Sequence, residues 1–451
     1  MGEIAGSVWW LLVSLGVLVT FHEFGHFYVA RRLGVRVLKF SIGFGPSLWS
    51  RTAKDGTEYA IAALPLGGYV RMLDEREADV PASRLHEAFN RKPVWVRIAI
   101  VAAGPLANLL LCVALLWAMF VIGRPDYAPV LGAVEGIAAD AGFRPGDTLV
   151  AVGERATPTW SEAGQALLSA ALDRSDVRVQ VRDADGVART RLLPLSSLPA
   201  TIDERRAVEH TGLVPRHRIA PPVVGAVPAD GPAHGIVRPG DVIVRVAGTP
   251  VRQWDEIAGV VQRAAAASPR VVLDIERDGE PLAVTLEAQR RTQGDATRWV
   301  LGIAAPNVRA PHDAVLRLSP LAAVPAAFAE GVHQARELVA MIGRAFTGAV
   351  SLQNTVAGPI TIGRAANAYA GEGVAWFLSL LAMLSLSLGI LNLLPIPILD
   401  GGHLLYYLIE LVKGSPVSER VMAAGQFVGL ALIAALMGLA FYNDIVNNLL
   451  R

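Results

Sequence analysis

The chain has 451 residues, of which 53% are hydrophobic and 18% are charged. This balance is too apolar for an ordinary soluble enzyme and indicates a membrane protein. The formal net charge of +1 argues against nucleic acid as a partner, and the single cysteine, Cys112, excludes a disulfide framework and a thiolate metal cluster.

The first predicted element is an apolar run at 4–30, long enough to cross a bilayer as a helix. It lacks the basic start and small-residue cleavage site of a signal peptide, so we expect it to be retained. The run contains His22, Glu23 and His26. Two imidazoles four residues apart lie on one face of a helix and suit one Zn²⁺. Ionisable groups at membrane depth are costly, and a metal ion would compensate for that cost.

The next segment, 36–72, is too broken by glycine and proline for a helix, and it includes Gly67, Gly68 and Tyr69. The second span follows at 96–122. Lys and Arg are frequent between the two spans, which predicts that this connection is cytoplasmic. The first part of the membrane domain is therefore predicted to end near residue 126.

Residues 127–220 and 221–308 repeat one pattern. The sequences VLGAVEGIAADAGFRPGD and VVGAVPADGPAHGIVRPGD each precede an alternating apolar strand, a helix-like segment and further strand-like runs. This order resembles the circularly permuted PDZ domains of bacterial proteases and implies two tandem PDZ-like α+β domains. The glycine of each Arg-Pro-Gly-Asp turn is expected to be left-handed, and the aspartate to bond nearby backbone.

PDZ folds capture extended peptides by adding a strand to a sheet edge, so we interpret the repeats as binding or size-filtering a substrate. A plain structural spacer is the alternative, because no residue in the repeats identifies a ligand. The segment 309–372 is helical and amphipathic in pattern. We expect it to lie on the outer membrane face and to gate access.

The third span is predicted at 374–394 and the fourth at 423–441. Between them, the sequence from Asn392 to His403 contains two prolines, which prevent a regular helix. Broken backbone at membrane depth is tolerated where protein or a water-filled cavity surrounds it. Asp400 is the candidate third ligand, because a catalytic zinc needs three protein ligands and one open position. The spacing requires no partner for His403, which is interpreted as structural or interfacial.

Four crossings place both termini on the same side of the membrane, opposite the basic connections. The membrane domain is thus predicted from 1–126 and 373–451, with the repeats between them. In a Gram-negative cell the repeats and both termini would be periplasmic, and the chain would be a multi-pass protein of the inner membrane.

His-Glu-Phe-Gly-His in one span and Leu-Asp-Gly near another resemble the signatures of the site-2 protease family of intramembrane metalloproteases. The sequences Gly43-Phe-Gly45, Leu64-Pro-Leu-Gly-Gly-Tyr69 and Ala103-Gly-Pro-Leu-Ala-Asn108, together with the tandem repeats, extend the resemblance to bacterial members over nearly the whole chain.

The resemblance implies one Zn²⁺ per chain held by His22, His26 and Asp400, with Glu23 as the general base. It also implies that 36–72 forms a membrane-associated β hairpin that pairs with an extended substrate. The implied substrate-binding residues are Asn392, Pro397, Gly67, Gly68 and Tyr69. For Asn392, local satisfaction of broken backbone is the alternative role.

By the same resemblance, the substrate is a single-span membrane protein such as an anti-sigma factor already trimmed outside. Its cleavage would activate an envelope-stress response, and remnant signal peptides are a further substrate class. Two rival interpretations stay open. One is a membrane-anchored PDZ scaffold with an inactive metal site. The other is a soluble-type zinc protease tethered to the membrane, which the position of His22 within an apolar span opposes.

Overall fold

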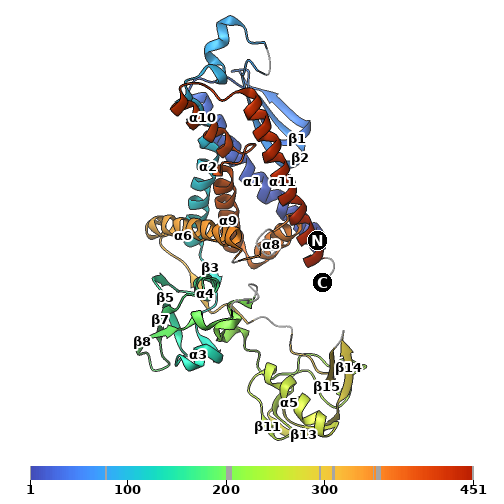
Figure 1. Cartoon of the computed structure of the whole chain (residues 1–451). Coiled ribbons are helices and arrows are strands. Elements are labelled where there is room, and N and C mark those ends of the chain that lie inside the picture. The colour runs from blue at the N-terminus through green and yellow to red at the C-terminus, as the bar shows by residue number, and fades with distance from the viewer. Residues whose placement is uncertain are drawn as a thin grey trace. The chain divides into compact units, whose positions relative to one another are not determined.

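A computed structural model of the chain describes residues 2–76, 79–199, 206–293, 296–306, 310–348, 350–351 and 357–448. The chain divides into two compact units (Figure 1). Met1–Pro125 and Val315–Arg451 form the first, here called the helical unit, and Asp126–Ala314 form the second, the repeat unit. The chain passes between the units at β3 (Arg124–Asp126) and β16 (Ala314–Leu316).

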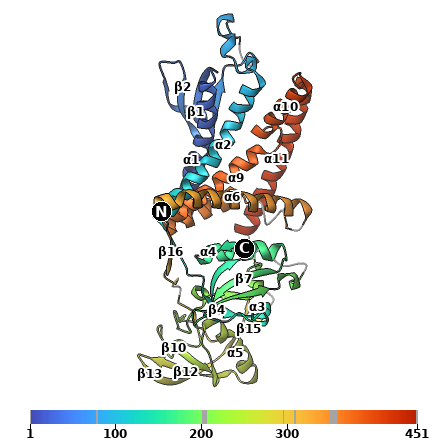
Figure 2. The same cartoon turned by 90° about the vertical axis from the view of Figure 1, so that its left-hand side faces the viewer.

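Four helices of the helical unit are long and apolar enough to cross a membrane. They are α1 (Glu3–Arg32), α2 (Val94–Ile122), α9 (Val374–Leu393) and α11 (Glu419–Asn448). Each contains or nearly matches one of the four predicted spans, and α11 extends beyond its prediction at both ends. Helices α1, α2 and α9 run side by side (Figures 1 and 2). Many large apolar side chains on these helices stay exposed, as expected of surfaces that face lipid.

The backbones of α1 and α2 approach each other closely near His22 and His26. A methyl group on Gly25 of α1 would lie 2.3 Å from the carbonyl oxygen of Ala103 on α2, so only glycine allows this contact. Further along α2, Cys112, Leu116 and Met119 are buried in an apolar cluster shared with α6 and α9. Helix α2 therefore lies at the centre of the helical unit.

Strands β1 (Val37–Thr52) and β2 (Glu58–Met72) pair with each other in an antiparallel, folded-back arrangement beside α1. The first part of β1 pairs with both halves of β2, so the segment 64–72 of β2 lies at one edge of the sheet. The short helices η1 (Ala82–Glu87) and η2 (Phe89–Arg91) lead into α2.

Three further helices complete this unit: α6 (Pro320–Thr347), α8 (Pro359–Glu372) and α10 (Asp400–Lys413). Helix α6 runs across the other helices and buries Ala323 and Ala327 in the cluster with α2 (Figure 2). The predicted helical segment 309–372 is thus largely helical, although residues 309, 349 and 352–356 lie outside the described part. The start of α1 and the end of α11 lie at the same end of the unit, beside α8 (Figure 1).

The tandem pattern of the sequence corresponds to a tandem pattern of structure. Each repeat contains a four-stranded sheet with the same order, β6-β5-β7-β8 in the first and β11-β10-β12-β13 in the second. The first comprises β5 (Thr148–Val152), β6 (Arg155–Ala156), α4 (Trp160–Leu172), β7 (Val177–Arg182) and β8 (Ala188–Leu193). The second comprises β10 (Val242–Val246), β11 (Thr249–Pro250), α5 (Trp254–Ala267), β12 (Arg270–Arg277) and β13 (Glu280–Glu287).

Shorter elements surround these sheets. They are β4 (Leu131–Val134), α3 (Gly136–Asp140), η3 (Leu195–Ser197), η5 (Glu209–Thr211), β9 (Leu213–Pro215), η6 (Arg216–Arg218), β14 (Gln289–Gln293) and β15 (Ala296–Val300). Each repeat has its own apolar core. The two repeats therefore each have what a separate small domain needs.

The Arg-Pro-Gly-Asp turns have the conformation expected from their residues. Gly146 and Gly240 have φ of +91° and +97°, in the left-handed region. The carboxylate of Asp241 accepts a hydrogen bond from the backbone N–H of Arg238 at 2.8 Å, and Asp147 does the same in the first repeat. An arginine from the sheet pairs with each buried aspartate, Arg277 with Asp241 in the second repeat.

Candidate metal centre

Three side chains from two distant parts of the chain converge in the helical unit. The Nε2 atoms of His22 and His26 lie 3.2 Å apart, and Oδ2 of Asp400 lies 3.1 Å from the first and 3.4 Å from the second. Both histidines are 8% exposed. Within the described part of the chain, this is the group of His, Cys, Asp and Glu that could hold a metal ion.

The spacing of these atoms fits zinc. Ligand atoms about 2.0–2.1 Å from a tetrahedral Zn²⁺ are separated from one another by about 3.3 Å. The three observed separations lie within 0.2 Å of that value. Oδ2 of Asp400 is buried and, apart from the two Nε2 atoms, has no polar partner among the described residues. A cation between the three atoms would satisfy this acceptor.

The two histidines are presented by α1, where a spacing of four residues places them on one face of the helix. Their other ring nitrogens contact α2. Nδ1 of His26 lies 2.8 Å from the carbonyl oxygen of Ile100, and Nδ1 of His22 lies 3.2 Å from the side-chain amide of Asn108. Helix α2 therefore contributes to the orientation of both rings.

Gly104 of α2 provides the space that the imidazoles occupy. A methyl group at this position would lie 2.2 Å from Nε2 of His26 and 2.9 Å from Cε1 of His22. Pro105 follows directly and removes one intrahelical donor from this turn. The sequence Ala103-Gly-Pro-Leu-Ala-Asn108 thus lies against the metal-ligand candidates.

Asp400 is placed by a tight turn between α9 and α10. It is the first residue of α10, and the irregular backbone of 394–399 precedes it. Ile398 has φ of +123°, an unfavourable conformation for a β-branched residue that commonly marks a functional site. Side chains on the two following glycines would overlap the turn, since a methyl group on Gly401 would lie 2.1 Å from the carbonyl oxygen of Leu394. The Asp-Gly-Gly sequence therefore allows α10 to begin directly against the turn.

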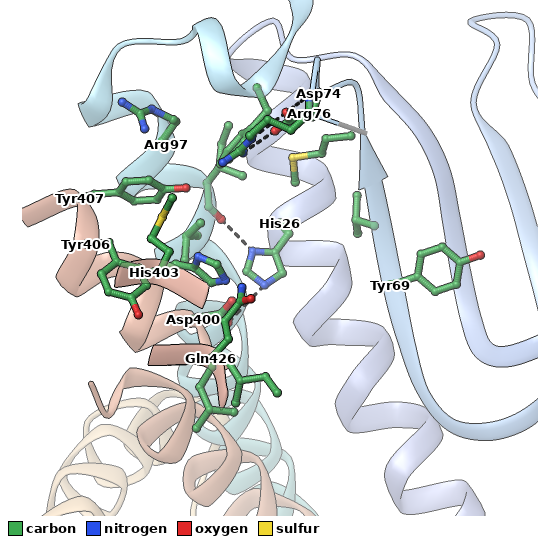
Figure 3. A pocket seen from close by; sticks show the side chains of 18 of the residues that line it. His26, Tyr69, Asp74, Arg76, Arg97, Asp400, His403, Tyr406, Tyr407 and Gln426 are labelled. Carbon is green, nitrogen blue, oxygen red and sulfur yellow. Dashed lines mark hydrogen bonds and ion pairs between the residues drawn. The ribbon is translucent and has the colours of Figure 1, made fainter. Parts of the chain in front are cut away.

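A cavity of about 740 Å³ opens beside the three ligand candidates. Figure 3 shows Asp400 and His26 pointing toward each other within it. Its lining also includes Glu23, Asn392 and His403, so His403 lies closer to the site than the sequence indicated. Charged residues line it as well: Arg71, Asp74, Arg76, Arg97, Glu410 and Glu419. The cavity is therefore suited to hold water.

The residues predicted to bind substrate are distributed unequally around this cavity. Asn392 and Tyr69 line it, although the Tyr69 ring points away from Asp400 (Figure 3) and stacks on Phe44. Gly67, Gly68 and Pro397 are not part of its lining. The structure thus brings two of the five to the cavity, and places the other three next to it.

The three residues outside the lining are tightly packed. A methyl group on Gly68 would lie 3.1 Å from Cγ of Glu23, so β2 passes directly beside the candidate base. One on Gly67 would overlap the ring of Phe44. Pro397 packs against α11, where a methyl group on Gly429 would meet its carbonyl oxygen at 2.1 Å. Asn392 donates a hydrogen bond to the carbonyl of Leu388, one turn earlier in α9, at 3.0 Å.

Sequence reasoning identified the ligand candidates but not the residues that hold them. Gly104 and Asn108 were recognised only as part of a family sequence, and Ile100 was not singled out. Their contacts with α1 join residues 74 to 86 positions apart. A glycine and an asparagine four residues apart within an apolar span were the available signal, since buried polar groups need partners.

Comparison with known proteins gives matches over nearly the whole chain. Residues 10–436 match the sequence profile described as "Peptidase family M50". A Xylella fastidiosa (strain Temecula1) protein named "Putative zinc metalloprotease" is 48% identical over 99% of this chain and 100% of its own length. The "Regulator of sigma-E protease RseP" of Escherichia coli (strain K12) is 41% identical, over 96% of this chain and 97% of its own. "Protease RseP" of Yersinia pestis is 40% identical over 98% and 99%.

Proposed function

Since the chain belongs to peptidase family M50 and is a zinc metalloprotease of the site-2 type, we propose that His22, His26 and Asp400 bind its zinc ion and that Glu23 is the general base of peptide hydrolysis. The observation that carries this proposal is the convergence of two imidazole nitrogens and one carboxylate oxygen within 3.4 Å of one another. Three ligands leave the fourth tetrahedral position open for water or substrate, as a catalytic site requires.

A zinc ion at this position would polarise the scissile carbonyl and make its bound water acidic enough to react near neutral pH. The carboxylate of Glu23 follows the first histidine in the chain and lines the same cavity. From there it accepts the proton of the attacking water and returns it to the leaving amine.

The substrate is proposed to be a single-span membrane protein cut in or near its transmembrane segment. Its helix must unwind first, because helical carbonyls are hydrogen-bonded and shielded. The edge segment 64–72 of β2 passes beside Glu23 and offers backbone groups to an extended chain. Exposed Phe44, Leu48 and Trp49 on β1 support insertion of this strand pair into the membrane. Asn392 at the cavity wall would then bind the unwound substrate backbone.

The repeats are proposed to be PDZ-like domains that bind or filter the outer segment of the substrate. Their shared strand order and separate cores support this. In the second repeat, a cavity of about 370 Å³ lies between α5 and the segment 299–304, with Trp254, Ile257 and Trp299 in its lining. An apolar groove beside a strand edge suits an extended peptide with apolar side chains.

The chain is proposed to lie in the inner membrane with its repeats and both termini in the periplasm. The Lys- and Arg-rich connections at the opposite end of the helical unit support this orientation. A pre-trimmed anti-sigma factor is the proposed natural substrate, in keeping with the name of the Escherichia coli relative. Remnant signal peptides are a second proposed class, because they also are short single spans.

The test is cleavage of a labelled single-span protein by purified full-length enzyme in lipid vesicles. Glu23→Gln is expected to lower the cleavage rate by about 10²–10⁴ while zinc stays bound, because only the base is lost. Asp400→Asn is expected to lose both zinc and activity, and a zinc chelator should stop the wild type. Glu3→Gln, an exposed carboxylate on the same helix, is the matched control and should cleave normally. Undiminished cleavage by Glu23→Gln would contradict the role of Glu23 as the base, and absence of cleavage by the zinc-loaded wild type would favour the scaffold alternative.

A further inference from the structure

The Nδ1 atoms of the two candidate ligand histidines contact different groups on α2. Nδ1 of His26 faces the backbone carbonyl of Ile100 at 2.8 Å, and a carbonyl oxygen only accepts hydrogen bonds. The proton of His26 must therefore be on Nδ1, which leaves Nε2 as a free lone pair for a metal. Nδ1 of His22 instead faces the side-chain amide of Asn108 at 3.2 Å, and an amide can donate or accept.

The two Nε2 atoms determine whether the Asn108 amide donates a hydrogen bond to Nδ1 of His22 or accepts one from it. The Nε2 atoms are 3.2 Å apart, and both can bind one cation only if neither carries a proton. A neutral His22 with a bare Nε2 carries its proton on Nδ1 and needs an acceptor there. With Nδ2 of Asn108 next to Nδ1, two donors would face each other.

The Oδ1 atom of Asn108 supports the opposite orientation of the side-chain amide. Asn108 is fully buried, and its Oδ1 has no hydrogen-bond partner among the residues that the structure describes. Half a turn of the amide exchanges oxygen and nitrogen with almost no change in shape. It would bring Oδ1 to Nδ1 of His22, where it accepts the N–H hydrogen bond.

We propose that Asn108 is a positioning residue of the metal centre, whose Oδ1 accepts a hydrogen bond from Nδ1 of His22 and keeps Nε2 free for zinc. Together with the Ile100 carbonyl, it makes α2 the helix that sets the tautomer of both histidines. A hydrogen bond also holds the backbone at this position, because Ser385 of α9 donates to the backbone carbonyl of Asn108 at 2.8 Å. Ser385 is itself fully buried. The inference rests on the proposed ligand set.

The experiment measures the zinc dissociation constant of the full-length protein in detergent by competition with a chelator of known affinity. Asn108→Leu removes the acceptor and is expected to raise that constant about 10–100-fold. Asn108→Asp keeps an oxygen acceptor of the same size and is expected to bind zinc as tightly as the wild type, or more tightly. Rescue by aspartate separates hydrogen-bond acceptance from packing, because packing alone does not require an acceptor.

Ser14→Ala serves as the matched control, since Ser14 is a buried residue on α1 whose hydroxyl donates a hydrogen bond to the Trp10 carbonyl. It should leave zinc affinity unchanged. Loss of affinity in Asn108→Asp equal to that in Asn108→Leu, or full affinity in Asn108→Leu, would overturn the proposal. Should Asn108→Leu not fold by circular dichroism, Asn108→Ala, which also lacks the acceptor, takes its place in both comparisons. Asp400→Asn run in parallel separates the two ideas, because wild-type affinity in that variant would instead contradict the ligand set.

Discussion

Gly104 shows how much of this metal centre depends on a position with no side chain. The two imidazoles occupy the space where its Cβ would be, and the neighbouring carbonyl of Ala103 lies against Gly25 of α1, where a methyl group would meet it at 2.3 Å. Glycine is needed at position 104 because no side chain fits there, whereas the candidate ligands are needed because their atoms can bind a metal ion. Both kinds of residue are needed to hold three atoms at zinc-binding distances.

Replacing Gly104 by alanine is therefore expected to displace the imidazole of His26 and to weaken zinc binding by at least about tenfold, as loss of supporting contacts does at other metal sites. The measurement is zinc content of the purified variant by elemental analysis after dialysis against a chelator. Gly343→Ala on α6 is a suitable control, because its added methyl group meets nothing within 4 Å. Stoichiometric zinc in Gly104→Ala would show that the helices can separate enough to accept the methyl group.

Among the elements, the second repeat contains a buried ion pair that makes its stability depend on pH. The guanidinium of Arg277 donates to the Asp241 carboxylate and holds the pKa of that carboxyl below its usual range. An aspartate with a lowered folded-state pKa stabilises the fold above its unfolded pKa, about 3.9, and loses that contribution as pH falls through the folded value. The sheet that contains β10 and β12 should therefore lose stability as the pH falls.

Hydrogen exchange of the full-length protein tests this expectation. As pH is lowered from about 6 to about 3, peptides from α5 and β12 should lose protection, after correction for the intrinsic pH dependence of exchange. Asp241→Asn should reduce the protection of these peptides already at neutral pH, with α4 and β7 of the first repeat as the internal reference. Equal protection of the second repeat in wild type and variant would contradict the assigned role of the pair.

The elements also show which features the sequence determines locally. The four apolar helices were predictable because a bilayer sets a minimum length for any apolar run that crosses it. The left-handed turns at Gly146 and Gly240 were predictable from Arg-Pro-Gly-Asp alone. Helix α10 was not, since Asp400 was expected within a broken loop and instead begins a helix. Two prolines indicate where a helix stops but not where the next one starts.

At the scale of the whole molecule, the sequence indicated the candidate ligands but not the residues that contact them, for a physical reason. His22, His26 and Asp400 are recognisable because their residue types are costly in a membrane. Gly104 and Asn108 matter through contacts between α1 and α2, and helical periodicity within one span carries no information on the partner helix. The folded-back pairing of β1 with β2 was likewise outside the reach of local patterns.

The proposed topology makes a prediction that the single native cysteine allows to be tested cleanly. Cys112 is fully buried in α2, so the wild type should not react with a membrane-impermeant maleimide. In intact cells with permeabilised outer membranes, Asp140→Cys in the first repeat should be labelled and Lys54→Cys between β1 and β2 should not. Labelling of Lys54→Cys, with Asp140→Cys protected, would reverse the orientation. Lysed membranes provide the control, since both positions are exposed and should then react.

The central claim is that two imidazoles from α1 and one carboxylate from the start of α10 bind one zinc ion. Zinc X-ray absorption spectroscopy of the purified full-length protein tests it most directly. We predict one zinc per chain with four nitrogen or oxygen neighbours near 2.0–2.1 Å and outer scattering from two imidazoles, and a changed first shell in Asp400→Asn. A spectrum without imidazole scattering, or one that is identical in wild type and Asp400→Asn, would contradict the account.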